Sequence, residues 1–270
     1  MVITAKDVMN LRKRTSLGMM ECKKALTQTQ GDVEKAIELL RETVGAKMAE
    51  RSDREAAEGA IAVASTDNAI ALVFLKSETD FTAKNDEFLA GARKIAELAL
   101  VCEDGDVANT PEMEAICENL RITIKENISV AQLTKMSGSK VGSYVHHTNK
   151  LGVILTGEGD LSDDLLRGLC QHLMVSDDKM FPRPIAISED QLPQDEVENK
   201  KQAFIAEATA TGKPAEIAEK MSAGKLRKWV EDRTLLSQIY VPEQDAKKPV
   251  SHYLPQGAKL VAFTRMEVGG

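Results

Sequence analysis

The chain has 270 residues, of which 43% are hydrophobic and 29% are charged, and its formal net charge is −7. This length allows about one to three domains with a buried core. The acidic balance excludes an overall basic footprint for nucleic acid, so we expect no direct nucleic-acid partner.

The first fifty or so residues read as three short helices. Thr4 is expected to cap the first helix and Asp32 the third. Gly18 lies in the loop before the second helix, where it is free to take a positive φ. Helices of this length are not stable alone, so they must pack on one another. Residues 1–54, which include a charged linker, are therefore predicted to form an N-terminal three-helix domain.

The pattern changes to that of strands after this linker. Two apolar runs between Gly59 and Thr79 flank Thr66-Asp-Asn68, which predicts a β-hairpin. A helix follows from Phe88 to Val101, and a second helix is capped by Thr110 with proline at its first position. A further strand is expected near residues 127–136. These elements make up a predicted unit over residues 55–140.

The same order of elements then repeats over residues 141–270. A hairpin from Val141 to Gly159 turns at Thr148-Asn-Lys150, Ser162 caps a helix, and the last strand runs from Lys259 to Val268. Two copies of a β-β-α-β unit, with antiparallel sheets covered by helices on one face, predict an α+β fold.

The second copy carries an insertion at about residues 187–231. It is read as two charged helices, Glu196–Ala210 and Ala215–Val230, separated by Thr211–Pro214. Their apolar stripes are thin, and such a stripe is either the seam of a helical hairpin or a surface for a partner. A solvated projection without a partner is the third possibility.

The stretch LKSETDFTAKNDEF, from Leu75 to Phe88, places an aromatic residue among polar ones in a chain that is only 4% aromatic. It directly follows an apolar strand. From the residues alone, Phe81 either folds back into its own core under the next helix or presents an exposed apolar ring.

Residues that could carry chemistry show no catalytic arrangement. The four cysteines form no C-x-x-C pair, the four histidines lack zinc-site spacing, and phosphate-binding and nucleophile motifs are missing. Neither a signal segment nor an apolar run of roughly 20 residues is evident, so we expect a cytoplasmic protein without membrane contact. We also expect no cofactor, no metal and no covalent chemistry, although an enzyme using Asp80, Glu87 or the His146–His147 pair is an alternative.

Several separated segments resemble one family. LRKRTSLGMMECKKALTQTQGDVEKAIELLR, from Leu11 to Arg41, is similar to the N-terminal segment of bacterial elongation factor Ts. ETDFTAKNDEF resembles the T-D-F-V-A-K-N signature of that family, with Thr82 in place of valine. GSYVHHTNKLGVIL, GKPAEIAEKMSAGKLRKW and FTRMEVGG also fit the family pattern, so the resemblance covers nearly the whole chain in order.

The resemblance implies a guanine nucleotide exchange factor for elongation factor Tu, the GTPase that carries aminoacyl-tRNA to the ribosome. The implied fold has a three-helix ubiquitin-associated-like (UBA-like) N-terminal domain, two α/β core subdomains and a coiled-coil hairpin. The hairpin serves in the family as a dimerisation or auxiliary contact, so a dimer of the heterodimer is a further expectation. Many members continue beyond the position of Gly270 with a short helical module that also contacts the GTPase. Relative to them, either this contact is naturally absent here or the module has been removed.

The resemblance also assigns roles to particular residues. Thr79, Asp80, Phe81 and Thr82 would displace Mg²⁺ from the partner, with Phe81 as a wedge between helices of the GTPase. An aromatic ring suits this role because it offers a large apolar area and loses little conformational entropy. Without the exchange role, the chain could be a pure binding module built on its three-helix domain.

The remaining implied contacts lie outside that segment. Arg12, Met19 and Met20 would dock on the GTP-binding domain of the partner, and His146 on its third domain. Adjacent helical residues face different ways, so one methionine could instead belong to the core. His146 could be merely structural. Cys22 is either a reactive thiol beside two lysines or a buried, inert one.

Overall fold

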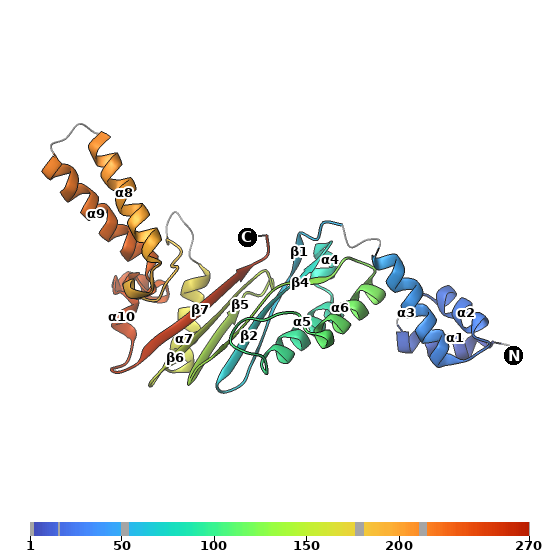
Figure 1. Cartoon of the computed structure of the whole chain (residues 1–270). Coiled ribbons are helices and arrows are strands. Elements are labelled where there is room, and N and C mark those ends of the chain that lie inside the picture. The colour runs from blue at the N-terminus through green and yellow to red at the C-terminus, as the bar shows by residue number, and fades with distance from the viewer. Residues whose placement is uncertain (1–2, 16, 50–53, 176–180, 211–214, 270) are drawn as a thin grey trace.

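The computed structural model describes residues 3–15, 17–49, 54–175, 181–210 and 215–269 (Figure 1). The molecule is elongated, with three N-terminal helices at one end, two β-sheets in the middle and a helical hairpin at the other end.

The N-terminal helices are α1 (Ala5–Thr15), α2 (Met19–Gln28) and α3 (Val33–Ala49). Both predicted caps are confirmed. Thr4 and Asp7 exchange hydrogen bonds, with the Asp7 amide donating to Thr4 Oγ1 over 3.3 Å, and the Lys35 amide donates to Asp32 Oδ1 over 3.1 Å. The helices share one buried cluster of Val8, Leu11, Leu17, Cys22, Ala25, Leu26, Ala36, Leu40 and Val44.

Gly18 does not use the conformational freedom predicted for it. Its φ is −63° and its ψ is 143°, which is the extended backbone of a residue that precedes a helix. Its amide donates to Glu21 Oε2 over 3.1 Å. The left-handed residues of this region are instead Gln30 and Gly31, at the end of α2.

The first sheet has the strand order β1-β2-β4-β3 and is antiparallel. Its strands are β1 (Glu58–Ser65), β2 (Ala69–Ser77), β3 (Gly105–Asp106) and β4 (Ser129–Ser137). The predicted turn is confirmed, because the Thr66 amide donates to the Ala69 carbonyl over 2.8 Å. One face is covered by the two predicted helices, α5 (Asp86–Ala99) and α6 (Pro111–Ile124), and the short helix α4 (Asp80–Ala83) follows β2.

The second sheet repeats this arrangement with the order β5-β6-β7. Its strands are β5 (Lys140–Val145), β6 (Leu151–Glu158) and β7 (Lys259–Glu267). In each copy the second strand is central and pairs with the first and last strands of the unit, which confirms the predicted repeat. Its buried cluster includes residues of α7 (Asp163–Met174), α10 (Val250–Tyr253) and the 3-10 helix η2 (Leu235–Ser237). Two further 3-10 helices, η1 (Glu189–Gln191) and η3 (Val241–Ala246), have no buried residue.

The two sheets pack against each other through their free faces (Figure 1). The shared cluster holds Ile61, Ile70, Leu72, Phe74, Ile154 and Met266. Strand β2 is therefore buried on both faces, which explains its continuous apolar run. The approach is close: a Cβ added to Gly152 would lie 2.6 Å from Ile61 Cγ2. The order of layers is helices, sheet, sheet, helices, an antiparallel α+β architecture.

The helices α8 (Gln194–Ala210) and α9 (Ala215–Arg233) form a hairpin that projects from the sheets (Figure 1). The residues buried on the hairpin include Ala208, Ala218 and Ser222, and Lys225 Nζ on α9 lies 2.6 Å from Glu207 Oε1 on α8. Part of the thin apolar stripe is thus a hairpin seam, while Ile205 and Ile217 stay exposed. The loop predicted at Thr211–Pro214 lies outside the described residues.

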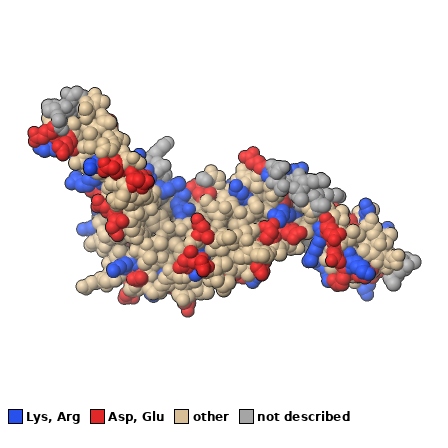
Figure 2. Space-filling view, viewed as in Figure 1, with Lys and Arg blue, Asp and Glu red and all other residues tan. Residues whose placement is uncertain are grey.

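The surface carries charges of both signs, intermingled over the face shown in Figure 2. Across the described ranges, no helix has the length and apolar character needed to cross a membrane. The same part of the chain brings no three His, Cys, Asp or Glu side chains together in a way that could hold a metal ion.

Candidate functional site at the Phe81 loop

Phe81 stands out on the surface because 82% of its side chain is exposed. It lies on α4, a four-residue helix between β2 and α5. The cap of this helix is Thr79, whose Oγ1 accepts a hydrogen bond from the Thr82 amide over 3.3 Å. The interpretation that Phe81 folds back into its own core is therefore wrong.

The loop beneath Phe81 is tied into the body of the protein. Ser77 is fully buried and its hydroxyl donates to the Thr79 carbonyl over 3.0 Å. Thr82 and Ala83 face inward and are buried. Four residues were assigned to this site from the resemblance. Phe81 is the exposed tip, and Asp80 lies beside it. Thr79 and Thr82 form the hydrogen bond that caps α4.

A carboxylate that sequence reasoning missed organises this loop. Glu126 accepts three hydrogen bonds, from the Glu78 amide (3.1 Å), the Thr79 amide (3.1 Å) and the Thr79 hydroxyl (2.7 Å). The Glu78 carboxylate in turn accepts from the Asn127 amide over 2.8 Å and pairs with Arg54 at 3.3 Å. Glu126 lies 47 residues from Thr79 in the chain, and no local pattern signals this contact.

Asp80 is a charged neighbour of Phe81. The hydrogen bond from Lys84 Nζ, at 2.7 Å from Asp80 Oδ2, lowers the pKa of Asp80, and the charges of Lys84 and Lys150 lower it further. Lys150 belongs to the turn between β5 and β6 and pairs with Glu58 at 2.8 Å. The Phe81 loop is therefore electrostatically coupled to the second sheet, and Asp80 is ionised at neutral pH.

His146 lies in the same turn between β5 and β6. It is half-buried, its Nδ1 is 2.8 Å from Thr148 Oγ1, and its ring centroid is 4.0 Å from that of His147. His146 and Lys150 line one cavity of about 360 Å³. The structure thus gives His146 a local hydrogen-bond partner and leaves part of the side chain accessible.

The predicted contacts of the N-terminal helices are all accessible. Arg12 is exposed, and Met19 and Met20 are 49% and 77% exposed. The alternative that one of the two methionines belongs to the core is wrong. Leu17, just before α2, is buried in the cluster of this unit together with Cys22.

Of the two alternatives that the sequence left open for Cys22, the structure supports the buried, inert thiol. Its side chain is buried, and its Sγ lies 3.6 Å from Thr15 Oγ1 and 3.8 Å from the Leu17 carbonyl oxygen. Nearby Lys23 and Lys24 are exposed, so they do not open the thiol to solvent.

Thiol labelling of the native protein is expected to modify at most one cysteine. Cys22, Cys117 and Cys170 are buried, and burial raises the pKa of Cys117 to about 11 and that of Cys170 to about 12, whereas Cys102 is half-buried. A disulfide reagent at pH 8 should therefore release no more than one equivalent of its leaving group before unfolding and four afterwards. Rapid loss of two or more thiols in the native state would contradict this arrangement.

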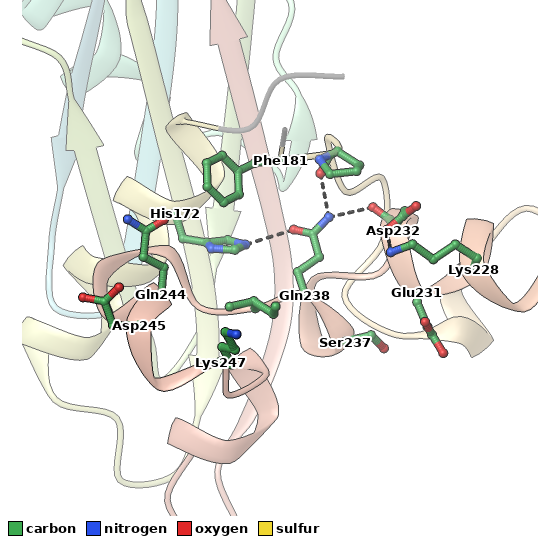
Figure 3. Close-up of a pocket in the computed structure, with 12 residues that line it drawn as sticks. His172, Phe181, Lys228, Glu231, Asp232, Ser237, Gln238, Gln244, Asp245 and Lys247 are labelled. Carbon is green, nitrogen blue, oxygen red and sulfur yellow. Dashed lines mark hydrogen bonds and ion pairs between the residues drawn. The ribbon is translucent and has the colours of Figure 1, made fainter. Parts of the chain in front are cut away.

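A larger cavity, of about 560 Å³, lies at the base of the helical hairpin (Figure 3), and Phe81 is not among the residues that line it. The Val241 amide donates to His172 Nδ1 over 3.2 Å, so Nε2 carries the proton and donates to Gln238 Oε1 over 2.9 Å. Gln238 Nε2 donates to the carbonyl oxygens of Pro182 and Asp232, each over 2.6 Å. Burial lowers the pKa of His172, which stays neutral. His172 and Gln238 thus spend their hydrogen-bonding groups on the chain itself, and these bonds connect α7 to the end of the hairpin.

The chain is similar in sequence to known proteins over nearly its whole length. A family model described as elongation factor TS matches residues 78–270. The chain is 38% identical to elongation factor Ts of Thioalkalivibrio sulfidiphilus over 284 residues, covering 100% of this chain and 93% of that protein. It is 39% identical to elongation factor Ts of Marinobacter nauticus (99% and 91%) and 38% identical to that of Colwellia psychrerythraea (100% and 92%). Matches at this identity, over nearly the full length of both chains, show that the chain belongs to the elongation factor Ts family.

Proposed function

We propose that this chain is a guanine nucleotide exchange factor that binds elongation factor Tu in its GDP-bound state and accelerates GDP release during translation elongation. Family membership supports the activity and the partner. The observation that carries the mechanism is the 82% exposure of Phe81 on a capped, internally bonded loop. A large apolar ring held out in solvent has no role in the chain's own core and suits insertion into a partner.

The mechanism follows from how a GTPase holds its nucleotide. Backbone amides, a lysine and a Mg²⁺ ion bind the phosphates of GDP, and the ion neutralises much of their charge. In our proposal Phe81 inserts between helices of the partner near this ion and displaces it, with Asp80 forming a hydrogen bond alongside. An exchange factor must bind the nucleotide-free state more tightly than the GDP state, and this coupling is reciprocal, so GDP then leaves faster. No covalent step is needed.

The other accessible residues extend this contact. The proposed N-terminal UBA-like domain, residues 1–54, docks on the GTP-binding domain of the partner through Arg12, Met19 and Met20. Methionine side chains adapt to irregular surfaces. In the proposed core subdomains, 55–140 and 141–270, Phe81 belongs to the first and His146 to the second, where His146 contacts the third domain of the partner.

The hairpin at about residues 187–231 is proposed to act as a coiled coil that joins two copies of the complex. The exposed Ile205 and Ile217 support this role, because isoleucines on a helical surface gain from burial against another helix. The size of the complex in solution tests it.

The test of the proposed activity is release of fluorescently labelled GDP from purified elongation factor Tu. With this protein added, the release rate is expected to rise with its concentration and to reach a plateau. Chelation of Mg²⁺ should speed release without the factor and reduce the further acceleration that it gives, because the ion is then already removed. An unchanged release rate at saturating factor would contradict the exchange function. If the factor accelerates release just as much after chelation, the Mg²⁺ mechanism is wrong, but the exchange function still stands.

A further inference from the structure

The last turn of α6 together with the two residues after it, residues 122–126, contacts the segments that carry both of the surfaces assigned to the partner by the proposed function. We propose that this turn is a positioning element, which fixes the Phe81 loop through Glu126, the start of α2 through Lys125, and the N-terminal helices as a unit through Ile122. The inference rests on the proposed exchange function. It assigns a positioning role to residues that do not themselves insert into the partner.

The first contact is that of Glu126 with the backbone before α4. One carboxylate accepts from two consecutive amides, of Glu78 and Thr79, and from the hydroxyl of Thr79. Hydrogen bonds to an ionised acceptor are stronger than neutral ones and fix direction. Since Thr79 caps α4, Glu126 sets where this helix begins and thereby where the ring of Phe81 points.

The second contact leads from the same turn to the N-terminal helices. Lys125 adopts a left-handed backbone (φ 69°) as the C-cap of α6, and its Nζ lies 3.0 Å from Glu21 Oε2. Glu21 Oε2 also accepts the Gly18 amide at the start of α2, next to Met19 and Met20. The ion pair thus holds the end of α2 that carries the predicted partner contacts.

The third contact is apolar. Ile122 on α6 is buried within the cluster of the three N-terminal helices and counts among its core residues. The N-terminal helices therefore complete their core with a residue of the body of the protein, and buried packing resists relative movement more than an exposed ion pair does.

These contacts together predict that Met20 and Phe81 reach the partner as two points of one rigid surface. Binding then loses less conformational entropy than it would with a freely jointed N-terminal unit. Glu126 should act mainly on the maximal exchange rate, because it directs the residue that expels the ion. Lys125 and Ile122 should act mainly on the concentration needed for half-saturation.

The experiment measures GDP release from elongation factor Tu across factor concentrations for Glu126→Gln and for Glu112→Gln. Glu112 is an exposed glutamate at the start of α6, the helix that precedes Glu126. The amide of the glutamine cannot accept all three hydrogen bonds, so Glu126→Gln is expected to lower the maximal rate about tenfold, with half-saturation changed less than about twofold. Glu112→Gln should match the wild type. Thr79→Val should reproduce the loss and Thr79→Ser should restore it, which keeps the test open if Glu126→Gln fails to fold.

Two further variants test the contacts with the N-terminal helices. Lys125→Asn keeps a residue that tolerates the left-handed backbone and should raise the half-saturating concentration about threefold, with the maximal rate unchanged. Ile122→Ala should raise it about tenfold. If both variants reach half-saturation at the wild-type concentration, Lys125 and Ile122 do not position the N-terminal helices.

A double-variant comparison separates positioning from a general structural role. In the Phe81→Ala background, Glu126→Gln should lower the exchange rate no further, because nothing is left to position. An equal loss in both backgrounds, or a wild-type rate for both Glu126→Gln and Thr79→Val, would overturn the proposal. If Phe81→Ala alone exchanges at the wild-type rate, the Mg²⁺ mechanism itself fails, and that result is distinct from either of these.

Discussion

Phe81→Ala is expected to remove most of the acceleration of GDP release and to leave the free energy of unfolding unchanged. The ring is 82% exposed, so its removal leaves no cavity in the chain's own core. If it is the residue that enters the partner, its loss should cost about 2 kcal/mol or more at the transition state for exchange, which is roughly a 30-fold lower rate. Labelled-GDP release and urea unfolding measure the two quantities.

The matched control is Val101→Ala, because Val101 is another apolar residue exposed at the surface, 89% in its case, beyond the end of α5. This variant should exchange at the wild-type rate, which separates loss of Phe81 from a general loss of surface apolar area. A Phe81→Ala protein that releases GDP as fast as the wild type would show that the ring is not the displacing group.

Phe88→Ala is expected to have the opposite profile. Phe88 is fully buried between α5 and the first sheet, in one cluster with Ile95 and Leu133. Replacing a buried phenylalanine with alanine typically costs about 3–5 kcal/mol, through lost burial and the remaining cavity. Urea unfolding should show this loss, and the fraction that stays folded should still accelerate GDP release. A loss below about 1 kcal/mol would contradict the burial of this ring.

The two phenylalanines lie seven positions apart and differ in the sequence only by what surrounds them. Phe88 begins a run with helical spacing through Leu89 and Ile95, and that spacing assigns it to a core face. Phe81 lies on a four-residue helix, which is too short for any period to orient its side chain. The resemblance to a family favoured exposure, and the tertiary structure shows it.

Local sequence signals predicted the helices and strands and much of their order. Apolar period and turn residues located the helices and strands, and the caps at Thr4, Asp32, Thr110 and Ser162 all hold in the structure. The repeated order of strands and helices also predicted two antiparallel sheets, because such signals are local and each falls within a few residues. Two expectations from local signals were not met: Gly18 keeps an ordinary φ, and neither Met19 nor Met20 belongs to the core.

Which surfaces meet depends on packing between segments that are far apart in the sequence. The apolar run of β2 predicted a strand, but not that one face would be covered by α5 and the other by the second sheet. The folded chain also brings Glu126 to Thr79 across 47 residues and places Ile122 in the core of the N-terminal helices. Such contacts depend on how the chain returns on itself, and a local period or cap carries no information about a partner so distant in sequence. The sequence thus determined the segment that carries Phe81, and the packing of distant residues around it determined that the ring faces solvent.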